Sequence, residues 1–261
     1  MSVTIHDLRA YKAAGKRFVM LTAYDFPTAQ ILDQAGVPVL LVGDSLAQGA
    51  LGYESTLPVT MEEMLHHTRA VARGARNALV VGDMPFLSYQ TSLEEGIRNA
   101  GRFLKEGGAH AVKIEGPQVE LTHKLVDLGI PVMAHVGLTP QSVHELGGYK
   151  VQGRGETAAR IQDQAHALEK AGAFAIVLEA VPAELGADIT GNLQIPTIGI
   201  GAGPGCDAQV LVINDLLGLT EKPPKLAKAY ANLRRAIADA VRAFAEDVEN
   251  GTFPDEGHSY H

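Results

Sequence analysis

The sequence repeats one unit eight times: a short run of β-branched and aliphatic residues, a turn with a polar residue, and an amphipathic stretch ending near glycine. Strands that alternate with helices pair in parallel through right-handed crossovers. Eight such units in 261 residues favour a closed barrel over an open sheet. We expect the strands at residues 18–23, 37–42, 78–81, 111–114, 131–134, 173–178, 196–200 and 210–213.

Glycine and proline mark where the intervening helices end and the strands begin. Gly36, Gly107, Gly129 and Gly172 follow helical stretches and fit left-handed C-terminal caps. Prolines at positions 38, 131 and 196 then open strands, where a missing amide hydrogen matters least. The best-defined helices are expected at residues 61–75, 93–106, 118–128 and 156–171.

A long final helix is expected over residues 225–250, with apolar residues three or four apart on one face. Either the barrel wall or another subunit would cover that face. Residues 1–261 are thus predicted to form a single α/β domain, a (β/α)8 TIM barrel with an extra N-terminal helix and a long C-terminal helix. Residues 251–261 would be a short polar tail.

Composition excludes several classes of protein. Lys and Arg total 22 against 30 for Asp and Glu, so the net charge is −8 and nucleic-acid binding is not expected. The single cysteine, Cys206, cannot form an internal disulfide or a thiolate zinc cluster, which favours a reducing cytoplasm. The sequence shows neither a leader nor an apolar stretch long enough to span a bilayer, so no membrane partner is expected.

Ionisable residues end five consecutive strands of the predicted barrel, the end where barrel enzymes place their chemistry. Each alone has a simpler explanation: a strand-terminal Asp can cap the next helix, a histidine can be a satisfied core residue, and a Glu can pair at the rim. Recurrence on successive strands favours a shared site. These residues are Asp44, Asp83, Lys113 with Glu115, His135 and Glu179.

Carboxylates without soft ligands suit a hard cation such as Mg²⁺. His66 and His67 are adjacent, so on a helix they diverge and do not form a zinc site. The glycines of residues 199–203 have G-x-G-x-G spacing, which is not a dinucleotide fingerprint. They would form either a phosphate loop after the seventh strand or a close backbone approach to a ligand.

Several segments, in order along nearly the whole chain, resemble the ketopantoate hydroxymethyltransferase (3-methyl-2-oxobutanoate hydroxymethyltransferase) family. The stretch HVGLTPQSVHELGGYKVQGR at residues 135–154 is the most specific of them. The others are MLTAYD (20–25), LLVGDS (40–45), GYESTLPVT (52–60), GDMPF (82–86), VKIEG (112–116), VLEAVP (177–182) and GIGAG (199–203).

The resemblance implies transfer of a hydroxymethyl group from 5,10-methylenetetrahydrofolate to 3-methyl-2-oxobutanoate. The product would be 2-dehydropantoate, in pantothenate and coenzyme A biosynthesis. It also implies a homo-oligomer, commonly a decamer. By the same resemblance Glu179 would be the catalytic base and Mg²⁺ would be held by Asp44, Asp83 and Glu115. The residues implied to bind substrate are Asp44, Ser45, Asp83, Lys113 and His135.

Two other functions fit the same pattern less well. A Mg²⁺-dependent 2-oxo acid lyase of the phosphoenolpyruvate mutase/isocitrate lyase type would share the barrel, but those enzymes generally use a cysteine-bearing loop. Here Cys206 follows the seventh strand instead. A non-catalytic binding barrel would be expected to lose strand-end charges, and none is missing from the predicted set.

Overall fold

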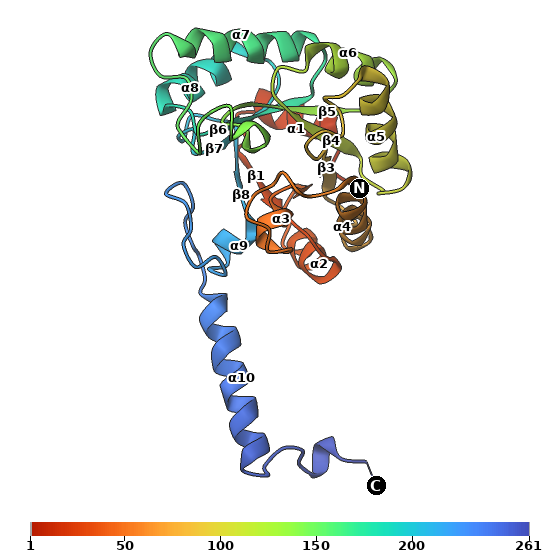
Figure 1. Cartoon of the computed structure of the whole chain (residues 1–261), viewed down its shortest axis with the longest axis vertical. Coiled ribbons are helices and arrows are strands. Elements are labelled where there is room, and N and C mark those ends of the chain that lie inside the picture. The colour runs from red at the N-terminus through yellow and green to blue at the C-terminus, as the bar shows by residue number, and fades with distance from the viewer. Residues whose placement is uncertain (1, 261) are drawn as a thin grey trace. The chain divides into compact units, whose positions relative to one another are not determined.

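The computed structural model describes residues 2–260, and the chain divides into two compact units, Met1–Val212 and Ile213–His261. In the first unit eight parallel strands pair in sequence order, and β8 pairs with β1 to close the barrel (Figure 1). The predicted TIM barrel is confirmed. The strands are β1 (Phe18–Thr22), β2 (Val39–Val42), β3 (Leu79–Asp83), β4 (Ala111–Glu115), β5 (Val132–Gly137), β6 (Ala175–Glu179), β7 (Thr197–Ile200) and β8 (Ala208–Leu211).

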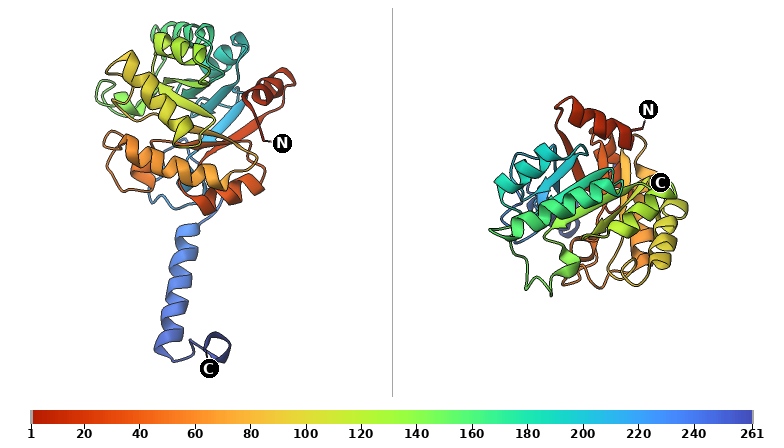
Figure 2. Two further views of the ribbon diagram at one scale, coloured as in Figure 1. Left: turned by 90° about the vertical axis from the view of Figure 1, so that its right-hand side faces the viewer. Right: turned by 90° about the horizontal axis from the view of Figure 1, so that it is seen from above.

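Helices lie outside the strands, as two further views show (Figure 2). Polar caps begin four of them: Thr4 and Thr60 form capping boxes at α1 and α4, and Asp25 and Ser92 cap α2 and α5. The helices of this unit are α1 (Ile5–Ala13), α2 (Phe26–Gln34), α3 (Leu46–Gly49), α4 (Met61–Gly74), α5 (Leu93–Lys105), α6 (Val119–Asp127), α7 (Thr157–Lys170) and α8 (Ala183–Asn192), with the 3₁₀ turn η1 (Pro140–Ser142).

The barrel interior is filled with apolar side chains, and α1 contributes to it. Leu8 of α1 is fully buried in the same cluster as Phe18 and Ala208, which begin β1 and β8. The predicted extra N-terminal helix therefore covers the amino end of the barrel. On β4, Ala111 belongs to this interior cluster, and side chains two apart on a strand share a face. Lys113 and Glu115 consequently point into the barrel toward its carboxyl end.

Four strands continue beyond their predicted ends. β3 includes Asp83, β4 includes Glu115, β5 runs to Gly137, and β6 includes Glu179. In the ladder Asp83 lies opposite Lys113, and Glu115 lies opposite His135. The apolar runs end earlier than the strands because the last inward positions carry ionisable side chains. These residues are thus held by sheet hydrogen bonds and do not belong to mobile loops.

One predicted glycine cap is wrong by a residue. Gly36, Gly129 and Gly172 have positive φ as expected, but after α5 it is Gly108, at φ 73°, that turns left-handed. Gly107 is required for another reason. A Cβ there would lie 2.5 Å from the carbonyl oxygen of Phe103, closer than any side chain allows.

The second unit contains α9 (Ile213–Leu216), α10 (Leu233–Glu249) and a 3₁₀ turn, η2 (Glu256–His258). α10 is the predicted long helix, but it begins at Leu233. Asn232 caps it by accepting from the backbone N–H of Arg235, while Tyr230 and Leu233 donate to carbonyls of residues 216 and 217. These bonds hold the preceding segment out of the helix.

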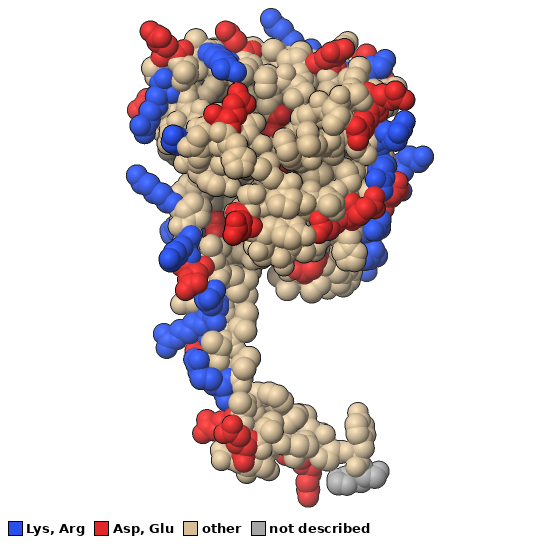
Figure 3. Space-filling model, viewed as in Figure 1, with Lys and Arg blue, Asp and Glu red and all other residues tan. Residues whose placement is uncertain are grey.

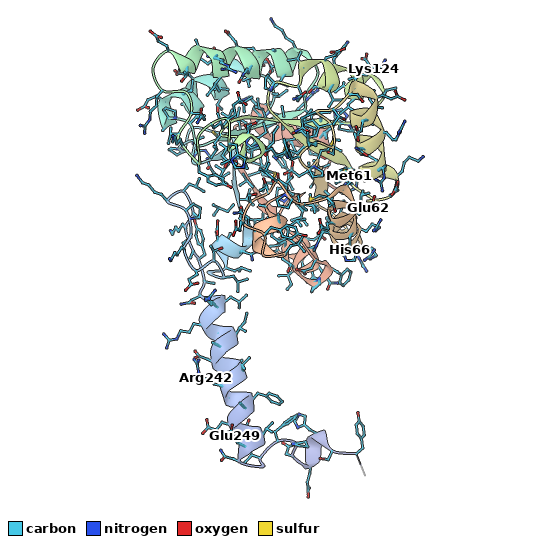
Figure 4. All side chains as sticks on the ribbon, in the orientation of Figure 1. Met61, Glu62, His66, Lys124, Arg242 and Glu249 are labelled. Atoms are coloured by element: carbon cyan, nitrogen blue, oxygen red, sulfur yellow. The ribbon has the colours of Figure 1, made fainter. Side chains whose placement is uncertain are left out.

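No residue of α10 is buried. Its apolar face therefore remains exposed in the described chain: Val241 is 61% exposed and Phe244 is 56% exposed. Phe244 contacts Phe253 of the following tail, with ring centroids 5.3 Å apart. Lys and Arg side chains line part of the helix, and Arg242 and Glu249 both project from it (Figures 3 and 4). Among the described residues, no helix has the length and apolar character of a membrane span.

Candidate active site

A buried lysine joins two neighbouring strands at the carboxyl end of the barrel. The Nζ atom of Lys113 lies 2.7 and 2.8 Å from the two carboxylate oxygens of Asp83, and 3.4 Å from Oε1 of Glu115. All three side chains are almost fully buried. Burial lowers the pKa of Lys113, but the charges of Asp83 and Glu115 outweigh it and raise that pKa. Lys113 is therefore a fixed cation.

Asp44 and Ser45 follow β2 beside this group. The backbone N–H of Asp44 donates to Oδ2 of Asp83 at 3.1 Å, and its Oδ2 accepts from Nε2 of Gln141 at 3.1 Å. Neither aspartate therefore serves as a side-chain helix cap, the simpler explanation considered for the sequence. The hydroxyl of Ser45 lies 2.9 Å from that of Tyr24, which follows β1.

His135 lies between the carboxylates of Glu115 and Glu179. Its Nδ1 lies 3.3 Å from Oε1 of Glu115 and its Nε2 lies 3.3 Å from Oε2 of Glu179, although neither contact has hydrogen-bond geometry. Burial and the charge of Lys113 lower the pKa of His135, but the two carboxylates outweigh them and raise it to about 9. The ring is therefore cationic at neutral pH.

The site holds more negative than positive charge. Burial, and then the charges of Asp83 and Glu115, raise the pKa of Asp44 well above its ordinary value. Burial also raises the pKa of Asp83, with Lys113 opposing. A divalent cation would relieve this repulsion, and carboxylate oxygens are the ligands Mg²⁺ prefers. The residues fit such an ion in charge and donor type, although residues 2–260 contain no preformed group of three His, Cys, Asp or Glu side chains arranged to hold a metal.

All seven predicted site residues thus lie at one end of the barrel. Contacts run without a break from Asp44 through Asp83, Lys113, Glu115 and His135 to Glu179. Their assigned roles stay predictions. Glu115 is already engaged on both oxygens, because Oε1 faces Lys113 and His135 and Oε2 accepts from the backbone N–H of Gln141.

Two neutral residues in this network were missed by reasoning from charge alone. Gln141 lies in η1, and the hydroxyl of Tyr89 bonds to both Gln141 and the backbone of Glu115. Gln141 stands inside the segment at residues 135–154 that carries the family resemblance. No local sequence signal marks either residue, because their partners lie 26 to 97 residues away along the chain.

The loop after η1 also lies beside the site. The backbone N–H of Gln152 donates to the carbonyl of Ala180, directly after Glu179. Burial first, and then the carboxylates of Asp44, Glu179 and Glu115, raise the pKa of Tyr149. Tyr149 itself is 57% exposed.

The two histidines rejected as metal ligands lie outside this network. His66 is exposed on α4, where Figure 4 labels it near Glu62. His67 instead donates from Nδ1 to the carbonyl oxygen of Tyr24 at 2.6 Å. The two rings thus face different surroundings, as expected for adjacent helical residues.

The glycines of residues 199–203 are explained by contacts within the protein. A Cβ on Gly203 would lie 2.4 Å from that of Ala183 in α8, and one on Gly199 would lie 2.9 Å from Sγ of Cys206. Close packing of β7 and its loop against neighbouring segments therefore accounts for these two positions without a ligand.

Comparison with known sequences gives one consistent result. A family profile described as ketopantoate hydroxymethyltransferase matches residues 2–256. The 3-methyl-2-oxobutanoate hydroxymethyltransferase of Syntrophus aciditrophicus (strain SB) is 59% identical over 99% of this chain and 96% of its own length. The enzyme of the same name from Acaryochloris marina (strain MBIC 11017) is 58% identical over 97% of this chain and 100% of its own.

Comparison with solved structures supports the fold alone, because sequence identity is low. A 2,3-dimethylmalate lyase of the PEP mutase/isocitrate lyase superfamily has a TM-score of 0.63 at 18% identity, covering 98% of this chain and 92% of its own. A phosphonopyruvate hydrolase in complex with oxalate and Mg²⁺ has a TM-score of 0.61 at 16% identity, covering 98% and 93%.

Proposed function

This chain belongs to the ketopantoate hydroxymethyltransferase family, and we propose that its site uses Mg²⁺ to transfer a hydroxymethyl group from 5,10-methylenetetrahydrofolate to 3-methyl-2-oxobutanoate. The product is 2-dehydropantoate. The chain is an enzyme of the pantothenate pathway. Full-length identity of 59% to a hydroxymethyltransferase outweighs the distant structural likeness to a lyase and disfavours a non-catalytic barrel.

The observation that carries the mechanism is the difference in exposure between Glu179 and its neighbours. The side chain of Glu179 is 17% exposed, whereas those of Asp83, Lys113, Glu115 and His135 are 5% exposed or less. Glu179 therefore lies at the open side of a buried charged group. A base in that position can reach a substrate bound against the cluster.

The buried group would bind the keto acid. Asp44 and Asp83, with Glu115, would hold Mg²⁺, whose positive charge would stabilise the negative charge that develops on the substrate by several kcal/mol. Lys113 neutralises the substrate carboxylate, and Ser45 donates a hydrogen bond to it. We assign His135 a substrate contact near the ketone or the transferred carbon, and its cationic ring also orients Glu179.

Glu179 then removes the proton from C3 of the keto acid. The electron pair left at C3 forms the new bond to the methylene carbon of the folate. Both bonds from that carbon to folate, at N5 and N10, break in turn, and water supplies the hydroxyl group. The proton taken from C3 and the remaining proton of that water go to the two nitrogens, so tetrahydrofolate is released. Proton removal thus needs Glu179 close to C3 and a cationic environment at the ketone.

The test is exchange of the C3 proton of 3-methyl-2-oxobutanoate in D₂O, followed by NMR with Mg²⁺ and without folate. We expect Glu179→Gln to slow this exchange by about 10²–10⁴-fold, because the base is lost, while keto acid binding stays near that of the wild type. Glu184→Gln is the matched control, since Glu184 is exposed on α8. Exchange retained in the Glu179 variant would remove it from the base role.

We propose that the enzyme is a cytoplasmic homo-oligomer, a decamer by family resemblance. The exposed apolar face of α10 supports self-association, because a second copy could cover it. Light scattering gives the subunit number directly. Val241→Asp should reduce it if this face forms a contact, and an unchanged mass would exclude the face.

A further inference from the structure

Gln141 is buried, with 5% of its surface exposed, and protein groups satisfy the full hydrogen-bonding capacity of its side chain. Nε2 donates to Oδ2 of Asp44 at 3.1 Å and to the carbonyl of Met84 at 2.9 Å. Oε1 accepts from the hydroxyl of Tyr89 at 2.8 Å and from Nε2 of Gln90 at 3.0 Å. Two donors and two acceptor sites are all that an amide has. If the amide group were rotated by 180°, its oxygen would face the Asp44 carboxylate and the Met84 carbonyl, which are both acceptors. The orientation of the amide is therefore fixed.

Gln141 also holds a second carboxylate through its backbone. Its N–H donates to Oε2 of Glu115 at 3.0 Å. Asp44 is 97 residues away along the chain and Glu115 is 26 residues away. One residue after β5 therefore joins the loop after β2 to the end of β4, and it does so at two of the three predicted metal ligands.

Tyr89 holds the side-chain amide of Gln141 through a hydrogen bond. Its ring is 3% exposed, and its hydroxyl donates to Oε1 of Gln141 while accepting from the backbone N–H of Glu115 at 3.0 Å. A phenolic hydroxyl has one proton to donate and can accept as well, and here both functions are used. The tyrosine thus fixes both the amide and the strand end that carries Glu115.

We propose that Gln141 is a positioning residue that aims the Asp44 carboxylate at the divalent cation, and that Tyr89 fixes Gln141 in the required orientation. This inference rests on the proposed function, because it takes Asp44 as a ligand. A hydrogen bond to Oδ2 blocks rotation of the carboxylate. Partners that orient metal-binding side chains typically contribute about 10–100-fold to metal affinity.

The test measures binding of Mn²⁺ alone, by EPR of the free ion, without keto acid or folate. Gln141→Met keeps the length of the side chain and removes its hydrogen bonds, and we expect a Kd for Mn²⁺ raised by about 10–100-fold. Tyr89→Phe removes only the hydroxyl, so its rise in Kd should be smaller. At saturating metal, kcat of both variants should approach that of the wild type, whereas the metal concentration needed for half-maximal activity should stay raised.

Matched controls separate positioning from general destabilisation. Asn77→Leu removes another amide-to-carboxylate hydrogen bond, from Asn77 to Asp33 at 2.9 Å, and Tyr53→Phe removes a hydroxyl-to-carboxylate bond to Glu63. Both should leave the Kd for Mn²⁺ at the wild-type value. A rise in the Asn77 variant equal to that in Gln141→Met would overturn the inference.

Wild-type Mn²⁺ affinity in folded Gln141→Met would overturn it as well, while leaving the proposed function intact. If Gln141→Met does not fold, Tyr89→Phe decides, and an unchanged Kd there counts against the proposal. A wild-type protein that neither binds Mn²⁺ nor exchanges the C3 proton would instead refute the proposed function itself.

Discussion

The two ends of the barrel each contain a buried or half-buried lysine paired with aspartate, yet they differ in charge balance. At the amino end Lys12 of α1 bonds to Asp207, just before β8, and to the carbonyl of Thr190. The same Asp207 oxygen accepts from the backbone and the hydroxyl of Thr197, which begins β7. One cation meets one anion, and the group is complete.

At the carboxyl end Lys113 faces Asp83 and Glu115, with Asp44 close by. The pKa of Asp44 is raised because burial and repulsion from the other carboxylates act together. The ion pair at the amino end is therefore neutral and internally satisfied, whereas the carboxyl end gathers more buried carboxylates than cations. This difference in charge balance distinguishes the candidate active site from a structural ion pair in the same barrel.

The largest expected effect is at Asp83. Asp83→Asn removes the closest anion from buried Lys113, so stability should fall by about 3 kcal/mol in urea unfolding. Turnover should require a much higher Mg²⁺ concentration, with activity at low metal reduced by about 10²-fold. Unchanged metal dependence in a folded variant would mean that the two ends differ only in burial.

At the amino end, Asp207→Asn should affect stability alone. Lys12 and Asp207 are partly exposed, so the expected loss is roughly 2 kcal/mol, measured by the same urea unfolding. The metal requirement and kcat should match those of the wild type. A shift in metal requirement would show that the two ends are coupled.

The next largest effect is a pH dependence of the free energy of unfolding that comes from His135 at the carboxyl end of the barrel. The pKa of His135 is raised from 6.5 to about 9 in the fold, so its contribution is fully present below pH 6.5 and is lost as pH rises through about 9. The stability difference between wild type and His135→Gln should shrink over that window, by on the order of 2 kcal/mol. His123→Gln, on an exposed position of α6, is the control and should show no such trend.

The smallest effect is expected for Thr197→Val. The hydroxyl of Thr197 donates to Asp207, and it also accepts from the Asp207 backbone N–H at 3.2 Å. Its loss should cost about 1 kcal/mol without any change in the metal requirement. Thermal unfolding with kinetics on the same sample would check this, and a kinetic defect would contradict a purely structural role.

The strands and helices of the barrel could be predicted because each is dominated by local apolar periodicity. Their ends were less predictable where polar residues stay in the ladder, as Asp83, Glu115 and Glu179 do. The start of α10 at Leu233 depends on the cap at Asn232 and on bonds to residues 216 and 217, which periodicity does not encode.

The candidate site shows the same limit. Charged residues on successive strands are conspicuous in the sequence, so Asp44, Asp83, Lys113 and Glu179 could be grouped in advance. Gln141 could not, because it is neutral and its meaning depends on partners far along the chain, such as Asp44 at a separation of 97 residues. Only folding reveals that this amide lies between two carboxylates.

The alternation of β4 has a consequence for how the gene can change. Lys113 and Glu115 share the inward face with Ala111 because these three residues are two positions apart along the strand. Deleting or inserting a single codon between Ala111 and Lys113 would keep an apolar strand yet turn both charges toward the surrounding helices. Lineages of this enzyme should therefore tolerate length variation in the loops but almost none within this five-residue strand.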